Sequence, residues 1–343
     1  MIEKYKKFLL VFVGLLFCAS VIYTGGFIWA NSLENGTSGY FAKNLLLENT
    51  KDRPRIIFES GSNSQHGINS LMIEKELGQL TLNMAHHAGY PLYLKFYHLL
   101  HNLNKDDVII LPLEYNYYTR KEHKIETSVL DELVANTKSY FNNLPLSKKI
   151  TILTQINSNQ TLKPYKDVFN HIKQQLFCSN CNFDAKKESN KLLYAGERGD
   201  VNYTALLNNG LDLSKRDDNK GFTCQEYIMF GDEINSDFAN DLKLLKKISK
   251  ETGAKFIFTY PALAGKNCFD FSTPQGKKLK SLIEQIKPLV ESYGFLFIGN
   301  PFDSYFPNNM LNTYWHIDEK ARDIRTKRLI EELKKTGLFN TNK

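Results

Sequence analysis

The sequence has no dense stripe of basic residues with interleaved aromatic residues, and its net charge of +7 is spread over 343 residues. Nucleic-acid-binding surfaces concentrate positive charge in such stripes, so nucleic acid is not an expected partner. The sequence also contains no internal repeats, which argues against a repeat architecture. A hydrophobic content of 42 % over this length is enough for one large core or two modest ones.

Cysteine is scarce, with five residues in the chain. Cys18 lies in an apolar N-terminal run, and the other four are Cys178, Cys181, Cys224 and Cys268. An even number in an exported domain predicts two disulfides, with three possible pairings. The Cys-x-x-Cys spacing is also compatible with zinc or redox chemistry. A zinc site, however, needs its second pair of ligands close together in sequence, and the last two cysteines are far apart. Structural disulfides are therefore expected, with no metal and no cofactor.

An uncharged run extends from Phe8 to Leu33 and follows three lysines at positions 4, 6 and 7. Its length is about that of a bilayer-spanning helix. A cleaved signal peptide ending at Ala30 is the alternative, but the bulky residues 27–29 are poorly suited to processing. Positive residues stay on the cytoplasmic side. We therefore expect an uncleaved membrane anchor at residues 1–33, a polar linker at 34–52, and the rest of the chain outside the cytoplasm.

Beyond the linker, short apolar segments alternate with amphipathic ones. Strands are predicted at residues 55–59, 79–83, 107–113, 255–260 and 295–298, and helices at about 237–252, 273–294 and 318–337. This alternation predicts an α/β domain over residues 53–337, a three-layer α/β/α sandwich with a mainly parallel five-stranded sheet. In such sheets the chemistry gathers in the loops after the carboxyl ends of the strands.

A long segment at about residues 119–235 separates the third and fourth predicted strands. It is rich in lysine, asparagine and aspartate, and it holds three of the four exported cysteines. A structureless loop of this length is uncommon in a compact domain. The segment is predicted to be an inserted, partly helical cap over the site, fastened by disulfides.

Ser62 is the first candidate for chemistry. It follows the first strand in a stretch of Gly, Ser and Asn, and helix-like sequence resumes near Leu71. A strand, a turn of small residues and a helix place such a serine near backbone N–H groups that can stabilise an anion. The alternative is an ordinary Gly/Ser loop.

His316 is the second candidate. It lies after the last strand and before the last helix, and so at the edge of the sheet where Ser62 is expected. The fold would therefore bring a nucleophile and a base together from distant parts of the chain. The alternative is a loop histidine hydrogen-bonded to the backbone.

These segments resemble sequence blocks of the SGNH (GDSL-like) hydrolase superfamily, especially the membrane-anchored members that handle acyl groups on bacterial cell-envelope polymers. Gly61-Ser62-Asn63, followed by Gly67-Ile68, is similar to the first block. Asn83-Met84-Ala85 is similar to the second block, Asn-x-Gly, with Ala85 in place of the glycine whose N–H belongs to the oxyanion hole. The resemblance spans roughly residues 55–333 and is interrupted by the long segment.

The third and last blocks depart from the family pattern. Leu113-Glu114-Tyr115-Asn116 replaces the expected Gly-x-Asn-Asp, and Asn116 is the candidate substitute. Asn312 or Thr313 occupies the place of the triad acid before His316. A carboxylate orients the imidazole and stabilises its protonated form, whereas asparagine can only orient it. A Ser–His dyad, or a site that only binds, therefore remains an alternative.

Other acids and rings near these blocks have alternative roles. Asp318 is the nearest acid, but its place before the last helix makes it a natural N-cap. Asp303 and Glu114 are further candidates from neighbouring loops. The adjacent histidines His86 and His87 diverge in a strand or a helix, so a shared metal ion is not expected. Three tyrosines could line a sugar-binding groove or pack beneath the cap; they are Tyr115, Tyr117 and Tyr118.

The resemblance implies a serine esterase or O-acyltransferase in the bacterial inner membrane, with its domain on the periplasmic side. Its substrate would be an envelope glycan or a lipid-linked sugar, and a multi-spanning acyltransferase is an expected partner besides the membrane. Ser62 would be the nucleophile, His316 the base and Asn312 its partner. The oxyanion hole and substrate site would be formed by Asn63, Asn83, Ala85, Glu114 and Asn116. The alternative function is a catalytically degenerate protein of the same fold that binds or helps assemble envelope polysaccharide.

Overall fold

The computed structural model describes residues 2–32, 39–120, 138–156, 196–203 and 233–339, together with the isolated residues 125, 129, 130, 133, 162, 165, 166, 169, 224 and 231. The chain forms two compact units. One comprises residues 1–36 and 127–183, and the other comprises residues 37–126 and 184–343. All the predicted site residues belong to the second unit.

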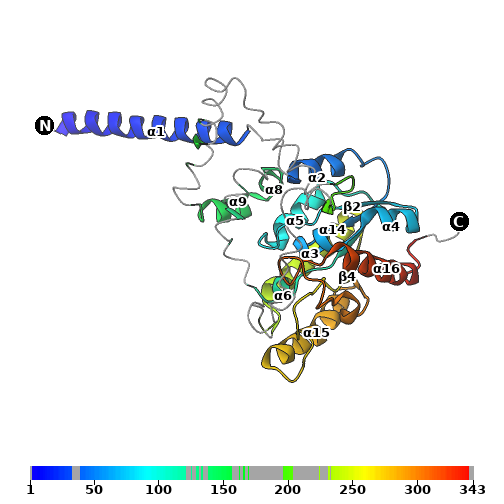
Figure 1. Cartoon of the computed structure of the whole chain (residues 1–343). Helices are drawn as coiled ribbons and strands as arrows, with labels where there is room; N and C mark the ends of the chain where they lie inside the picture. Colours follow the sequence, from blue (N-terminus) through cyan, green and yellow to red (C-terminus); the bar gives the residue numbers. More distant parts are fainter. Residues whose placement is uncertain are drawn as a thin grey trace, which may run out of the picture. The chain divides into compact units, whose positions relative to one another are not determined.

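The second unit is built on a parallel sheet of five strands in the order β2-β1-β3-β4-β5 (Figure 1). Its strands are β1 (Arg55–Phe58), β2 (Leu80–Asn83), β3 (Val108–Leu111), β4 (Lys255–Thr259) and β5 (Leu296–Ile298). Every neighbouring pair is parallel. The α/β class and the parallel five-stranded sheet predicted from the sequence are thus confirmed.

The inner strand β1, which lies between β2 and β3, shows why a continuous apolar run indicates a strand. Successive side chains of a strand point to opposite faces of the sheet. Ile57 accordingly packs into one core cluster, while Ile56 and Phe58 pack into another. All three side chains are fully buried. A central strand of a parallel sheet is covered on both faces, so its sequence is continuously apolar instead of alternating.

The helices of the second unit divide between these two core clusters. The cluster of Ile57 receives side chains from α5 (Leu92–Leu100), α14 (Ser236–Thr252) and α15 (Pro274–Ser292). The cluster of Ile56 receives side chains from α4 (Ser70–Leu77) and α16 (Glu319–Lys335), which lie against each other (Figure 1).

Polar side chains cap the starts of three long helices of this unit. Thr273 accepts a hydrogen bond from the N–H of Gly276, and Asp318 accepts one from Ala321. Asp318 is therefore the N-cap of α16, as its position indicated. The cap of α14 is Asn235, whose side chain accepts a hydrogen bond from the N–H of Asp237.

The segment predicted as a linker, residues 34–52, contains a helix of its own. This helix, α2 (Gly39–Glu48), places Leu47 in the main core with no exposed surface. Lys43, also on α2, is almost completely buried. The polar composition of this segment concealed these two contacts, because they depend on the sheet lying beside the helix.

The first unit contains α1 (Ile2–Ser32), α8 (Lys138–Asn142) and α9 (Leu146–Leu153). Residues Glu3–Tyr23 of α1 form a span of 21 residues with a mean hydropathy of 1.9. By length and composition this helix can cross a membrane. Most of the predicted cap at 119–235 lies outside the described residues, as do Cys178 and Cys181.

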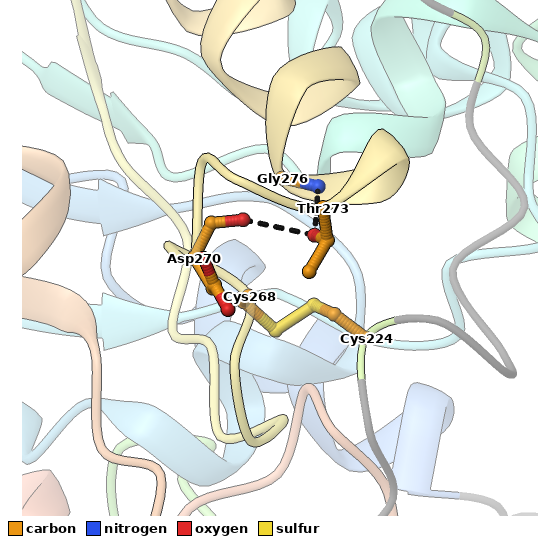
Figure 2. Close-up of a disulfide and its surroundings, with 5 residues drawn as sticks. All are labelled: Cys224, Cys268, Asp270, Thr273 and Gly276. Atoms are coloured by element: carbon orange, nitrogen blue, oxygen red, sulfur yellow. Dashed lines mark hydrogen bonds between the residues drawn. A yellow bond between two sulfur atoms is a disulfide. The ribbon is translucent and has the colours of Figure 1, made fainter.

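Among the described residues, a disulfide joins Cys224 to Cys268, which are 44 positions apart in sequence and have their Cα atoms 4.8 Å apart. Figure 2 shows that it lies beside the turn that starts α15. In this turn Thr273 donates its hydroxyl hydrogen bond to the carbonyl of Asp270 and caps the helix at Gly276. The disulfide therefore fastens the chain at Cys224 to the loop between β4 and α15.

Candidate active site

Ser62 and His316 meet at the carboxyl end of β1. Ser62 is the first residue of the short helix α3 (Ser62–Gly67), and His316 lies in the loop before α16. The Ser62 Oγ atom is 2.7 Å from the His316 Nε2 atom. Both residues are partly exposed, so a substrate can reach them. The two candidates separated by 254 residues of sequence are thus within hydrogen-bonding distance.

Asn312 contacts the other nitrogen of His316. Its Oδ1 atom lies 2.7 Å from His316 Nδ1. An amide oxygen can only accept, so Nδ1 carries the proton and Nε2 presents a lone pair to Ser62. Burial, followed by the charge of His87, lowers the pKa of His316 to about 4. The ring is therefore neutral near pH 7 and able to accept a proton.

The acids considered as partners of His316 have other roles. Asp318 caps α16. Asp303 lies on the short 3-10 helix η2 (Pro301–Ser304), where its carbonyl accepts a hydrogen bond from Arg328. Glu114 is turned toward the backbone of the Ser62 loop.

Glu114 holds that loop with both carboxylate oxygens. Its Oε2 atom accepts hydrogen bonds from the Ser60 hydroxyl and the Gly61 N–H, each at 3.0 Å, and Oε1 accepts one from the Asn63 N–H at 3.1 Å. A Cβ atom on Gly61 would lie 2.2 Å from Oε1, so only glycine fits there. Glu114 is fully buried, and its function in this structure is to fix the position of Ser62.

Asn63 is also bound to the scaffold. Its amide donates to the Ser60 hydroxyl and to the carbonyl of Pro112, and its Oδ1 atom accepts a hydrogen bond from the Ala262 N–H. Asn63 therefore ties the Ser62 loop to the loops after β3 and β4. The structure assigns it support of the loop and no contact with the Ser62 hydroxyl.

Asn83 and Ala85 are hydrogen-bonded to each other at the carboxyl end of β2. Asn83 donates to the carbonyl of Ser64 and to Asp200, and its Oδ1 atom accepts the Ala85 N–H at 3.1 Å. The Ala85 N–H, expected to face the oxyanion, is thus bonded to Asn83.

Ala88 is a neighbour of the Ser62 loop. A Cβ atom on Gly61 would lie 2.6 Å from the Ala88 Cβ, so Ala88 borders the Ser62 loop. Within the described part of the chain its N–H donates no hydrogen bond.

Asn116 and its neighbouring tyrosines lie on α6 (Tyr115–Thr119). The Asn116 Oδ1 atom is buried and has no hydrogen-bond partner among the described residues, and no contact of this side chain with Ser62 or His316 is observed there. The three tyrosines are each 1 % exposed and belong to the main core. They pack inside the domain and do not line a groove.

Two buried lysines, Lys95 and Lys43, hydrogen-bond to the backbone of the loops that carry the site residues, and neither was predicted from the sequence. Lys95 forms an ion pair with Glu59 at 3.1 Å and donates to the carbonyl of Ser60 at 2.6 Å. Lys43 donates to the carbonyl of Ala85, and burial lowers its pKa to about 7. The sequence signal for Lys95 was its place within the apolar run 92–100, because a lysine buried in such a run needs a partner for its charge.

His66 was missed as well. Its ring stacks on that of His316, with the ring centroids 3.9 Å apart and the planes inclined by 21°. Near it, the Tyr203 hydroxyl lies 2.6 Å from the carbonyl oxygen of His66 and 2.7 Å from that of Ile317. The adjacent histidines His86 and His87 have different surroundings. His86 is buried beside Lys95, whereas His87 is exposed.

No protein-family model matches this chain, and no curated protein matches it. Across the described residues, no group of three or more His, Cys, Asp or Glu side chains is placed to hold a metal ion. The chemistry of the site follows from its own geometry: a hydroxyl, an imidazole that can take its proton, and an amide that sets the tautomer.

Proposed function

We propose that this protein is a membrane-anchored serine esterase or O-acyltransferase of the SGNH type. The observation that carries the proposal is the Ser62–His316–Asn312 chain of hydrogen bonds, with both distances at 2.7 Å. Helices packed into both core clusters of the parallel sheet support the three-layer arrangement that this superfamily uses. The substrate class is an acylated envelope glycan or lipid-linked sugar, in keeping with an apolar helix that tethers the domain to a membrane.

The reaction begins when the Ser62 oxygen attacks the carbonyl carbon of an acyl ester while His316 Nε2 takes the hydroxyl proton. The oxyanion is stabilised by the N–H groups of Ser62 and Ala88. Ser62 is the first residue of α3, so its N–H has no partner within the helix. His316 then gives its proton to the departing alcohol, leaving an acyl group on Ser62.

The second half of the reaction distinguishes the two activities. His316 takes a proton from the acceptor hydroxyl, which attacks the acyl-Ser62 carbonyl and releases the serine. Water as the acceptor gives hydrolysis, and a sugar hydroxyl gives transfer. A multi-spanning acyltransferase in the same membrane is the proposed source of the acyl group in the second case.

Labelling with a fluorophosphonate probe tests the proposal on the full-length protein in detergent. We expect one modified peptide, containing Ser62, and no labelling of Ser62→Ala. His316→Ala should react about 100-fold more slowly, because the general base is lost. Ser292→Ala, a change at a surface serine at the end of α15, is the matched control and should label normally.

The alternative is a protein of the same fold that binds envelope polysaccharide without turning it over. The neutral Asn312 beside His316 favours it, because an amide does not stabilise an imidazolium. A folded wild-type protein whose Ser62 resists the probe would support this alternative and refute the enzyme.

A further inference from the structure

His66 lies one helical turn after Ser62 on α3. Residues four apart share a face of a helix, so the nucleophile and the His66 ring point toward the same side. The ring of His316 lies against that side, in contact with Ser62 at its edge and with His66 over its face. His66 thus touches the general base without touching the nucleophile's hydroxyl.

The position of His66 is fixed by several neighbours. Its side chain is buried, and Arg325 donates to the carbonyl of the next residue, Gly67. Tyr203 bridges the backbone of His66 to that of Ile317, which follows His316 in sequence. The backbone segments that carry the two stacked rings are therefore held at a constant separation.

The orientation of His316 has little other support. The hydrogen bonds to Ser62 and Asn312 lie at the two nitrogens, in the plane of the ring. Asn312 is exposed, and its amide offers no charge to hold the imidazole. The flat contact with the His66 ring restricts rotation of the His316 ring about its Cβ–Cγ bond. The exposed Asn312 amide restricts this rotation only weakly.

We propose that His66 is a positioning residue of this site. Its ring, stacked on His316, keeps Nε2 directed at Ser62 and keeps water away from that face of the imidazole. In this respect the stacked ring adds to the orienting contact of Asn312 with Nδ1, while the charge of the absent carboxylate is not replaced. The inference rests on the proposed function, because it assigns His66 a role in activating Ser62.

The electrostatics agree with such a role. Burial, then the proximity of His316 and of Lys43, lowers the pKa of His66 well below its usual value. His66 is therefore neutral when His316 becomes protonated, and it does not oppose that charge. Besides burial, and the proximity of His316 in the case of His66, the groups that lower these pKa values are Lys43 for His66 and His87 for His316.

The test compares three variants of full-length protein: His66→Ala, His66→Leu and His66→Phe. The rate of fluorophosphonate labelling at Ser62 is measured as a function of pH. We expect His66→Ala and His66→Leu to label at least about tenfold more slowly, since the ring of His316 loses its flat contact. His66→Phe restores a flat ring and should remain within about threefold of wild type.

The pH profile separates positioning from simple destabilisation. In His66→Ala, water reaches the face of His316, so the acidic limb of the profile should move to higher pH, because a hydrated imidazole is protonated more easily. In His66→Phe the limb should stay in place. His101→Ala, at an exposed histidine remote in sequence, is the control, and thermal unfolding of each variant reports folding.

The possible outcomes are distinct. Wild-type rate and limb in folded His66→Ala, or equal slowing in His66→Leu and His66→Phe, would overturn the positioning role alone. Failure of the wild type to label at Ser62 would overturn the proposed function and this inference with it. Should His66→Ala not fold, the comparison of leucine with phenylalanine decides the question.

Discussion

Asn312 occupies the place where a catalytic triad has a carboxylate. It sets the tautomer of His316 through its amide oxygen, but it leaves the imidazolium formed during the reaction without a countercharge. Burial, followed by the charge of His87, lowers the pKa of His316 to about 4, and Asn312 supplies no negative charge to raise it. The surroundings of His316 therefore disfavour protonation of its ring.

The Asn312→Asp variant should be more active than the natural protein. An aspartate in the same position would stabilise the protonated ring, and we expect Ser62 labelling at pH 8 to increase at least about tenfold. The pKa of His316, about 4 in the natural protein, would rise toward neutrality, so we expect the acidic limb of the labelling profile to lie at higher pH in the variant.

The matched control for that variant is Asn309→Asp, in the same loop, where the side chain donates to Asp318 instead of contacting His316. It should leave the limb unchanged. An Asn312→Asp protein with unaltered rate and limb would mean that His316 does not cycle through a protonated form.

Individual residues differ in how far the sequence could identify them. Ser62 and His316 follow from their places beside a strand end and a helix start. The stacking of His66 and the Ala88 N–H depend on the approach of loops distant in sequence, and no local pattern specifies that approach. Ala85 was chosen from its likeness to a sequence block, and the structure bonds its N–H to Asn83 instead.

The loop between β1 and α3 depends on a single buried carboxylate from the end of β3. Glu114 receives three hydrogen bonds from Ser60, Gly61 and Asn63, so it joins two neighbouring elements at the point where the nucleophile is held. A fully buried charge is costly unless its hydrogen bonds are complete, and here two backbone N–H groups and a hydroxyl complete them.

Glu114→Gln should damage both stability and reactivity. The glutamine amide would direct N–H groups at a backbone N–H, leaving at least one buried donor unpaired. We expect a loss of about 2–4 kcal/mol in the free energy of unfolding, measured with denaturant. We also expect slower Ser62 labelling. Glu284→Gln, at an exposed i,i+4 pair on α15, should change stability by less than about 0.5 kcal/mol. Equal stabilities of the two variants would contradict the assigned role of Glu114.

The elements themselves were largely predictable. Each strand lies within two residues of its predicted bounds, because apolar runs flanked by polar turns leave few alternatives. Helix α2 was not predicted, since a short helix with a polar surface shows a core contact such as Leu47 only once the sheet is present.

For the molecule as a whole, the apolar helix α1 and the site belong to different compact units. Placement in a membrane should therefore depend on α1 and not on the integrity of the site. The segment Glu3–Tyr23 has the length and hydropathy for this purpose.

Two arginines in the middle of α1 test this separation. In the double variant Leu15→Arg, Leu16→Arg each charge costs about 2.5–3.5 kcal/mol at the centre of a span. The protein should then be extracted from the membrane pellet by alkaline carbonate, whereas wild type and the double variant Leu15→Ile, Leu16→Ile stay in the pellet. Retention of the arginine variant would show that another part of the chain provides the attachment.

The separation of Ser62 from His316 along the chain has a consequence for biosynthesis. The ribosome makes Ser62 first, and His316 follows 254 residues later in the sequence. An unfinished or proteolytically shortened polypeptide that lacks the last loop and α16 carries a serine with ordinary reactivity. On the proposed function, Ser62 becomes reactive only after the loop that carries His316 has been made and has folded against it.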